Sequence, residues 1–266
     1  MKRSSLVLAM WMLVLGMPVG VAVAEAAEPL VIAASPSLRQ PLEALGHAFE
    51  AMHPEVRVKL YFGTGLEIRQ TIAAMENSSV GQYFVGRGPI HLVAPGGDEL
   101  ITRLQQRYYV LPDGARAYAR EQLVLVVPEQ LVEAPTSFAD IHKTVKRLAV
   151  ADPKRTALGE QTRSLLRSLQ FDGQLDIATD AQGVLDHILS GQADAGVIFG
   201  HEAVREQERV RVVAVAATGY VPIVHSMAME RYCPNRKLCE EFLAFVQSAE
   251  AQKVLKGLGY AVPEGR

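Results

Sequence analysis

The sequence has only two cysteines, Cys233 and Cys239, among its 266 residues. Two thiols cannot supply a four-ligand zinc site or the framework of a disulfide-built miniprotein. An excess of positive charge is also lacking, because 27 Lys and Arg stand against 29 Asp and Glu. This balance argues against a nucleic-acid partner, which would require a surplus of cations. Because 49% of the residues are hydrophobic, we expect one large domain or two modest ones.

Common signatures of catalytic and cofactor sites are missing as well. The seven histidines form no HExxH motif and no pair four residues apart, so a zinc enzyme is unsupported. The chain has no GxSxG elbow, no GxxxxGK[ST] loop and no GxGxxG at a strand-to-helix turn. His91 falls in a predicted strand, where a structural histidine is the alternative to a catalytic base. The sequence therefore predicts no nucleophile, and we expect no cofactor.

Residues 1–24 have the pattern of an export signal. Two cations precede an apolar run over residues 6–23, and an Ala-Val-Ala triplet ends at Ala24. A membrane anchor is the alternative, but a proline and two glycines interrupt the run and no positive flank follows it. We therefore predict cleavage between Ala24 and Glu25 and release into the periplasm, without a lipid tether because no lipobox cysteine is present.

Export would place Cys233 and Cys239 in an oxidising compartment. Their C-x5-C spacing allows a small disulfide, which would contribute roughly 2 kcal/mol by restricting the unfolded chain. Two unpaired, half-buried thiols are the alternative. Neither alternative requires a metal ion.

Apolar runs and helical periodicity alternate along the chain. Short apolar runs predict strands, and stripes spaced three or four residues apart predict helices. The predicted strands are 30–34, 56–62, 90–94, 123–127, 148–151, 196–199 and 210–216, and the predicted helices are 38–49, 66–75, 98–108, 160–169, 180–188, 238–246 and 251–258. Such alternation indicates an α/β fold with parallel sheets covered by helices on both faces.

Small, polar or glycine-rich turns lie directly before four of the predicted helices. They occupy residues 35–37, 64–65, 156–159 and 179–181. The first N–H groups of a helix lack intrahelical acceptors and carry partial positive charge, so they can hold an oxyanion without a cation. Ordinary helix capping is the alternative for each turn taken alone. An anion site requires several turns to converge at the carboxyl ends of strands.

Four segments resemble the periplasmic molybdate-binding proteins of ABC importers. LVIAASPSL is similar to the family's AAASL segment, and RLAVADPKRTALGEQTRSLL resembles RLAVGDPxxxPAGxYAKEAL. DAQGVLDHILSGQADAGVIFGHEA is similar to DVRxALxxVxxGEADAGIVYxSDA, and NRKLCEEFLAFVQSAEAQKVLKGLGY resembles AxxFxxFLxSPEAQxxLxKYGF. The last motif is shared with other solute-binding proteins, whereas the middle two occur in the family's order and spacing. The resemblance covers nearly the whole mature chain and implies a divergent member of the family.

The resemblance implies a two-lobed clamshell of the type II periplasmic kind. Each lobe is expected to contain a mostly parallel sheet flanked by helices. After the signal peptide of residues 1–24, residues 25–121 and 224–266 would form one lobe. Residues 122–223 would form the other, so the chain would cross the hinge twice.

In that family, uncharged donors bind a tetrahedral oxyanion between the lobes. Ser37 matches a serine that gives both its hydroxyl and its N–H, and Thr64 with Gly65 matches a second serine-bearing turn. Leu158 and Ala181 match residues that give only a backbone N–H. The resemblance therefore implies that Ser37, Thr64, Leu158 and Ala181 contact the molybdate oxyanion itself, not a metal cation.

Three features depart from the family pattern. Phe199 falls where the family has a tyrosine whose hydroxyl reaches the anion, and Gly65 lacks a hydroxyl that Thr64 would have to replace. The stretch 76–88 is unusual and would either bring Tyr83 or Arg87 near the ligand or form a surface loop.

The implied function is capture of molybdate, and also of tungstate, by a monomer that delivers it to the membrane subunit of an ABC permease. No reaction is implied. One alternative is a periplasmic lyase or dehydratase on the same fold, in which His91, Glu67 or Arg87 would act with Asp180. A binding protein for another anion and a sensory module that signals through a partner are further alternatives.

Overall fold

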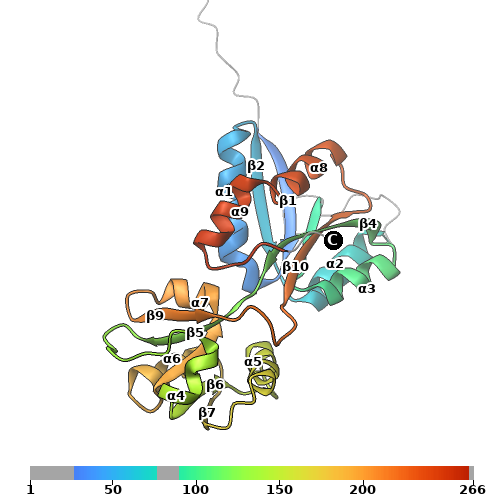
Figure 1. The fold of residues 1–266 in the computed structure, drawn as a ribbon. Coiled ribbons are helices and arrows are strands. Elements are labelled where there is room, and N and C mark those ends of the chain that lie inside the picture. The colour runs from blue at the N-terminus through green and yellow to red at the C-terminus, as the bar shows by residue number, and fades with distance from the viewer. Residues whose placement is uncertain (1–26, 77–89, 264–266) are drawn as a thin grey trace, which may run out of the picture.

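A computed structural model describes residues 27–76 and 90–263 of the chain. These residues contain two five-stranded sheets, which Figure 1 shows in two separate lobes. The predicted signal peptide, Tyr83 and Arg87 lie outside the described residues.

The first sheet has the strand order β2-β1-β3-β10-β4. Its strands are β1 (Glu28–Ala34), β2 (Val56–Phe62), β3 (Leu92–Ala94), β4 (Val110–Arg120) and β10 (Val224–Glu230). Strand β1 pairs in parallel with β2 and β3, whereas β10 is antiparallel to both of its neighbours. Four of the five strands therefore run in one direction, and the carboxyl ends of β1, β2 and β3 meet at one edge.

The second sheet repeats this plan in the order β7-β6-β8-β5-β9. Its strands are β5 (Leu123–Pro128), β6 (Arg147–Ala151), β7 (Gln174–Ala178), β8 (Ala195–Phe199) and β9 (Val210–Val215). Strand β6 is parallel to β7 and β8, and β5 is antiparallel to β8 and β9. The carboxyl ends of β6, β7 and β8 consequently share one edge.

Helices cover both faces of the first sheet. They are α1 (Arg39–Met52), α8 (Arg236–Phe245) and α9 (Ala249–Gly257) on one face, and α2 (Gly65–Glu76) and α3 (Asp98–Gln106) on the other (Figure 1). Because successive strand residues point to opposite faces, Leu30 and Ile32 of β1 join the core under α1, whereas Ala33 joins the core under α2 and α3. A short 3₁₀ helix, η1 (Pro36–Leu38), links β1 to α1.

The second sheet packs around a single apolar cluster. Its helices are η2 (Phe138–Asp140), α4 (Ile141–Thr144), α5 (Ala157–Ser168), α6 (Ala181–Leu189) and α7 (Gly200–Arg205). Strands β5 and β8 supply continuous buried runs, as expected for central strands covered on both faces.

The chain passes between the sheets twice, and the two crossings are bonded to each other. Glu121 and Gln122 join β4 to β5, and residues 216–223 join β9 to β10. The N–H of Glu121 donates to the carbonyl oxygen of Ile223 at 2.8 Å. Each crossing is followed by the strand that runs against the others of its sheet, β5 or β10. The predicted lobe boundaries stay a prediction.

Several elements differ from the sequence prediction. Strands β4, β7 and β10 were not predicted, nor were the short helices α4 and α7. Helix α5 begins at Ala157, three residues before its predicted start, because the Thr156 side chain caps it. Cys233 and Cys239 are joined by a disulfide, which was the first of the two alternatives. Among the described residues, no helix has both the length and the apolar character that a bilayer span needs.

Candidate functional site

The six residues that the resemblance implies lie at the ends of strands in both sheets. In the first sheet, Ser37 follows β1 within η1, and Thr64 and Gly65 follow β2. Since β1 and β2 are parallel neighbours, these turns occupy the same edge. The turns are also bonded, because the N–H of Gly63 donates to the carbonyl oxygen of Ala34 at 3.0 Å.

The other three residues share an edge of the second sheet. Leu158 is in the first turn of α5 after β6, and Ala181 is the first residue of α6 after β7. Phe199 is the last residue of β8 and the N-cap of α7. The structure thus gathers the six residues into two groups, one in each lobe. That the two groups enclose one ligand is part of the proposal below.

Helices α2, α5 and α6 begin with the same arrangement of hydrogen bonds. In each, the side chain of the residue just before the helix accepts a hydrogen bond from the N–H of the third helical residue. The N–H of Glu67 donates to Thr64 at 3.2 Å, that of Gly159 to Thr156 at 3.0 Å, and that of Gly183 to Asp180 at 3.0 Å. The backbone carbonyl of the same cap accepts from the fourth N–H. The first two N–H groups of each helix then have no acceptor within their helix. These donor pairs are Gly65 with Leu66, Ala157 with Leu158, and Ala181 with Gln182.

Each of these helix starts carries a carboxylate, Glu67 in α2, Glu160 in α5 and Asp180 at the cap of α6. The side chain of Glu67 accepts from the N–H of Thr64 at 2.6 Å, and Asp180 is the N-cap of α6. Hydrogen bonds from Thr64 lower the pKa of Glu67 below its usual value, and the bond from the backbone N–H has the larger effect. Negative charge therefore stands beside donors that would hold an anion, and it opposes anion binding there.

The hydroxyl of Ser37 lies beside a second hydroxyl. Its Oγ is 3.0 Å from the Oγ of Ser35, and the Ser37 side chain is exposed to solvent. The N–H of Ser35 donates to the carbonyl oxygen of Ala94 at 3.0 Å, which ties this turn to β3. The turn can therefore present hydroxyl donors to a ligand from a fixed backbone.

Phe199 offers no polar atom to a ligand. Its ring is 8% exposed and belongs to the core of the second lobe, and its N–H donates to Oε2 of Glu202 at 2.9 Å. Helix α7 also differs from the other three, because the N–H of Gly200 donates to the carbonyl oxygen of Gln122. Burial raises the pKa of Glu202 above its usual value.

Three of the four residues named for an alternative lyase or dehydratase, those within the described part of the chain, have structural contacts. His91 is buried, and its Nδ1 accepts from the N–H of Val31 at 3.2 Å. Glu67 accepts from the N–H of Thr64 at the start of α2, and Asp180 caps the start of α6 in the other lobe. No cluster of three or more metal-ligating side chains occurs within residues 27–76 and 90–263.

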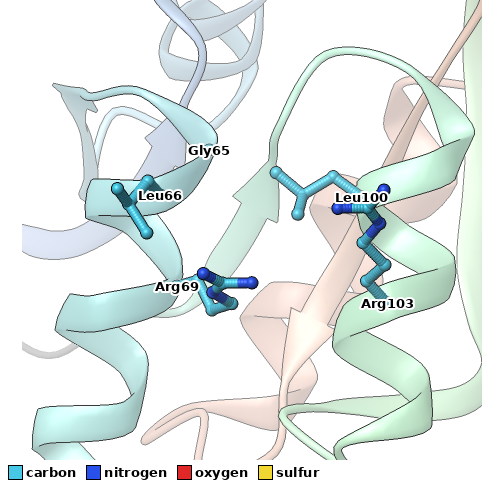
Figure 2. A pocket seen from close by; sticks show the side chains of 5 residues that line it. All are labelled: Gly65, Leu66, Arg69, Leu100 and Arg103. Atoms are coloured by element: carbon cyan, nitrogen blue, oxygen red, sulfur yellow. The ribbon is translucent and has the colours of Figure 1, made fainter.

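A cavity of about 290 Å³ adjoins Gly65, and two arginines line it, Arg69 of α2 and Arg103 of α3 (Figure 2). The sequence interpretation missed both. The sequence gave a partial signal for Arg69, because it lies four residues after Gly65 and therefore on the same face of α2. The pairing of α2 with α3 could not be inferred from either helix alone.

This topology, with two similar sheets joined by two crossings, is the two-lobed fold of the type II periplasmic binding proteins. Residues 30–261 match the family described as bacterial extracellular solute-binding protein. The chain belongs to that family.

Relatives named for molybdate match most of the chain at low identity. The molybdate-binding protein ModA of Mycobacterium tuberculosis is 22% identical over 242 residues, which are 90% of this chain and 87% of that protein. A solved substrate-binding domain from Clostridium difficile, described for a molybdenum ABC transporter, has a TM-score of 0.77 at 20% identity and covers 90% of this chain and 100% of its own. The periplasmic molybdate-binding protein of Azotobacter vinelandii has a TM-score of 0.55 at 17% identity, over 88% of this chain and 100% of its own. At these identities the solved structures establish the fold alone.

Proposed function

We propose that this protein captures a tetrahedral oxyanion, molybdate and also tungstate, in the periplasm and delivers it to an ABC permease. The curated relatives named for molybdate support the ligand class. The main structural support is that Gly65, Leu158 and Ala181 each belong to a pair of N–H groups left over at a helix start. Such groups bind anions at helix N-termini in many proteins.

The proposed chemistry is binding without reaction. Ser37 and Thr64 would donate from one lobe, and Leu158 and Ala181 from the other, so the closed form alone would present the full set of donors. A ligand that contacts both lobes favours closure by its differential affinity for the two forms. The permease would then recognise the closed form.

The test is isothermal titration of the mature chain, starting at Glu25, with molybdate, tungstate, sulfate and phosphate. We expect molybdate and tungstate to bind with Kd values within about three-fold of each other. Sulfate should bind at least ten-fold more weakly, because a smaller anion leaves longer hydrogen bonds. The absence of heat with all four anions would rule out the proposal.

A matched pair of proline variants tests the backbone donors directly. Proline is well tolerated at the first position of a helix and removes its N–H. Asp180 and Thr156, which precede Ala181 and Ala157, already have the extended conformation that proline requires of the residue before it. We expect Ala181→Pro to weaken molybdate binding at least ten-fold, since a hydrogen bond to a charged group contributes about 1.5 to 3 kcal/mol. Ala157→Pro should leave the Kd within two-fold. Equal effects of the two variants would contradict the assignment of Ala181.

A further inference from the structure

The cavity between α2 and α3 has a composition that the oxyanion site does not explain. Its volume is about 290 Å³, and it is lined by Gly65, Leu66, Arg69, Leu100 and Arg103. Figure 2 shows the Arg69 side chain pointing from α2 toward α3, whereas the Arg103 side chain runs along α3 and ends beside Leu100. None of the five lining residues is acidic.

Gly65 leaves room here for the Leu100 side chain of α3. A Cβ at this position would lie 2.5 Å from Cδ2 of Leu100, so any side chain would have to displace that leucine. The glycine that departs from the family's serine-bearing turn is therefore part of the contact between α2 and α3. It lies beside the cavity that Arg69 and Arg103 line.

The cavity combines positive charge with apolar surface. Two acidic residues adjoin the lining in sequence: Glu67, which accepts from the N–H of Thr64 at 2.6 Å and does not line the cavity, and Glu99, which directly precedes Leu100. Leu66 is 53% exposed, a large apolar area to leave beside two guanidinium groups. An organic anion would cover Leu66 and Leu100 with its carbon atoms, whereas a mineral anion would leave both leucines in water.

We propose that this cavity binds a small organic acid that carries two anionic groups, carboxylate or phosphate, one for each arginine. Guanidinium groups bind carboxylate and phosphate oxygens through paired hydrogen bonds. The volume of about 290 Å³ lies at the lower end of the range of roughly 300 to 1,000 Å³ for small-molecule sites, which suits a small organic acid. This site shares Gly65 with the proposed oxyanion site, but it takes a different class of ligand and does not depend on oxyanion capture.

The experiment is isothermal titration of the mature chain with four probes. Malate and phosphoglycolate each carry two anionic groups, whereas acetate and inorganic phosphate each supply one. We expect the first two to bind at least ten-fold more tightly than the second two. A preference for phosphoglycolate over malate would identify a phosphate-bearing ligand, and the reverse a dicarboxylate. No binding of malate or phosphoglycolate, or equal binding of all four probes, would overturn the proposal.

Variants assign the binding to the two arginines. Arg69→Gln and Arg103→Gln should each weaken binding of the better probe at least five-fold, and the double variant should abolish it. Arg163→Gln, at an exposed arginine of α5, is the matched control and should leave the Kd unchanged. If a Gln variant fails to fold, Arg69→Lys and Arg103→Lys keep the charge but lose the paired hydrogen bonds, and weaker binding is still expected. Unchanged binding in folded variants would overturn the proposal.

The two proposals fail separately. Arginine-dependent heat with malate or phosphoglycolate but none with molybdate would remove oxyanion capture and leave the second site. Binding of molybdate that Ala181→Pro weakens, without heat from any organic probe, would remove the second site alone.

Discussion

Asp180 has two opposing effects at the start of α6. Its Oδ1 accepts from the N–H of Gly183 at 3.0 Å, which stabilises the helix as an N-cap. The same carboxylate lies next to Ala181, whose N–H is a proposed donor to a dianion. The helix needs the acceptor atom at this position but not the charge, so the two effects can be separated by one substitution.

Asp180→Asn should tighten molybdate binding. Asparagine caps a helix about as well as aspartate, while the change removes the repulsion between the carboxylate and a doubly charged ligand. We expect the Kd to fall about three- to ten-fold at low ionic strength, and by less as added salt screens the charge. Titration at two salt concentrations measures this.

The control for that substitution lies in the same helix. Asp186 is exposed and accepts a hydrogen bond from Gln182, farther from the helix start. Asp186→Asn should change the Kd by less than two-fold. A folded Asp180→Asn protein with unchanged or weaker binding would mean that the ligand does not lie at the start of α6.

At the scale of single elements, two helical glycines illustrate how packing determines the effect of the same substitution. A Cβ at Gly159, in the first turn of α5, would lie 2.4 Å from the backbone oxygen of Ala151. A Cβ at Gly257, the last residue of α9, would meet nothing within 4 Å. Neither glycine has a positive φ, so space alone distinguishes them.

Gly159→Ala should destabilise the protein, and Gly257→Ala should stabilise it. The first change forces α5 away from the end of β6, and overpacking of this kind costs about 1 to 3 kcal/mol. The second restricts the unfolded chain and contributes about 0.4 to 1 kcal/mol. Urea unfolding curves measure both changes, and equal stabilities of the two variants would contradict the close packing of α5 on β6.

The Gly159→Ala variant should also weaken molybdate binding, because Leu158 directly precedes Gly159.

The elements that sequence analysis missed depend on distant partners. Strand β4 contains Pro112, Asp113 and Gly114, which locally oppose a strand, and β10 contains His225, Ser226 and Glu230 in a buried run. These two strands pair with each other across about a hundred residues of sequence. Tertiary pairing outweighs local propensity in both. Apolar runs such as that of β5 were predicted because their pattern is local.

The candidate site also has a part that local sequence predicts and a part that depends on distant residues. Sequence patterns placed turns before helices at residues 156–159 and 179–181, and the family resemblance then singled out Leu158 and Ala181 within them, because a helix start exposes N–H groups whatever its side chains are. The burial of Phe199 in the core and the shared cavity of Arg69 and Arg103 could not, because each depends on elements far apart in the sequence.

At the scale of the whole molecule, a buried carboxylate joins the two lobes. Glu121, between β4 and β5, is 2.9 Å from Nδ1 of His201 in α7 and 3.0 Å from Nε2 of His225 in β10. The Tyr260 ring stacks on His201 with 5.3 Å between centroids. Burial also raises the pKa of Tyr260, so its phenol stays neutral. The cluster bridges the two sheets at the crossing of the chain.

The ionisation of this cluster is set by burial and pairing together. Burial alone would raise the pKa of Glu121, but hydrogen bonds from His201 and His225 and their positive charge lower it to about 2. Burial opposes the charged form of His201, yet the hydrogen bond to Glu121 raises its pKa above the usual value. Glu202 and Arg205, the other charged groups facing His201, act in opposite directions on it.

Stability should therefore fall on both sides of a window that begins near pH 4.5 and ends where His201 loses its proton. A carboxyl with a lowered folded pKa contributes stability that is present above its unfolded pKa of about 4.5 and is lost as pH falls toward 2, for Glu121 about 3 kcal/mol in all. His201 contributes stability that is complete below about pH 6.5 and is lost as pH rises through its raised folded pKa. Glu121→Gln removes the charge on which both contributions depend. The melting temperature of this variant should therefore be lower than that of the parent protein within the window, and it should vary less with pH on either side. Glu208→Gln, at an exposed glutamate after α7, is the control and should follow the parent curve. Parallel curves for Glu121→Gln and the parent protein would mean that the cluster does not hold the lobes together through charge.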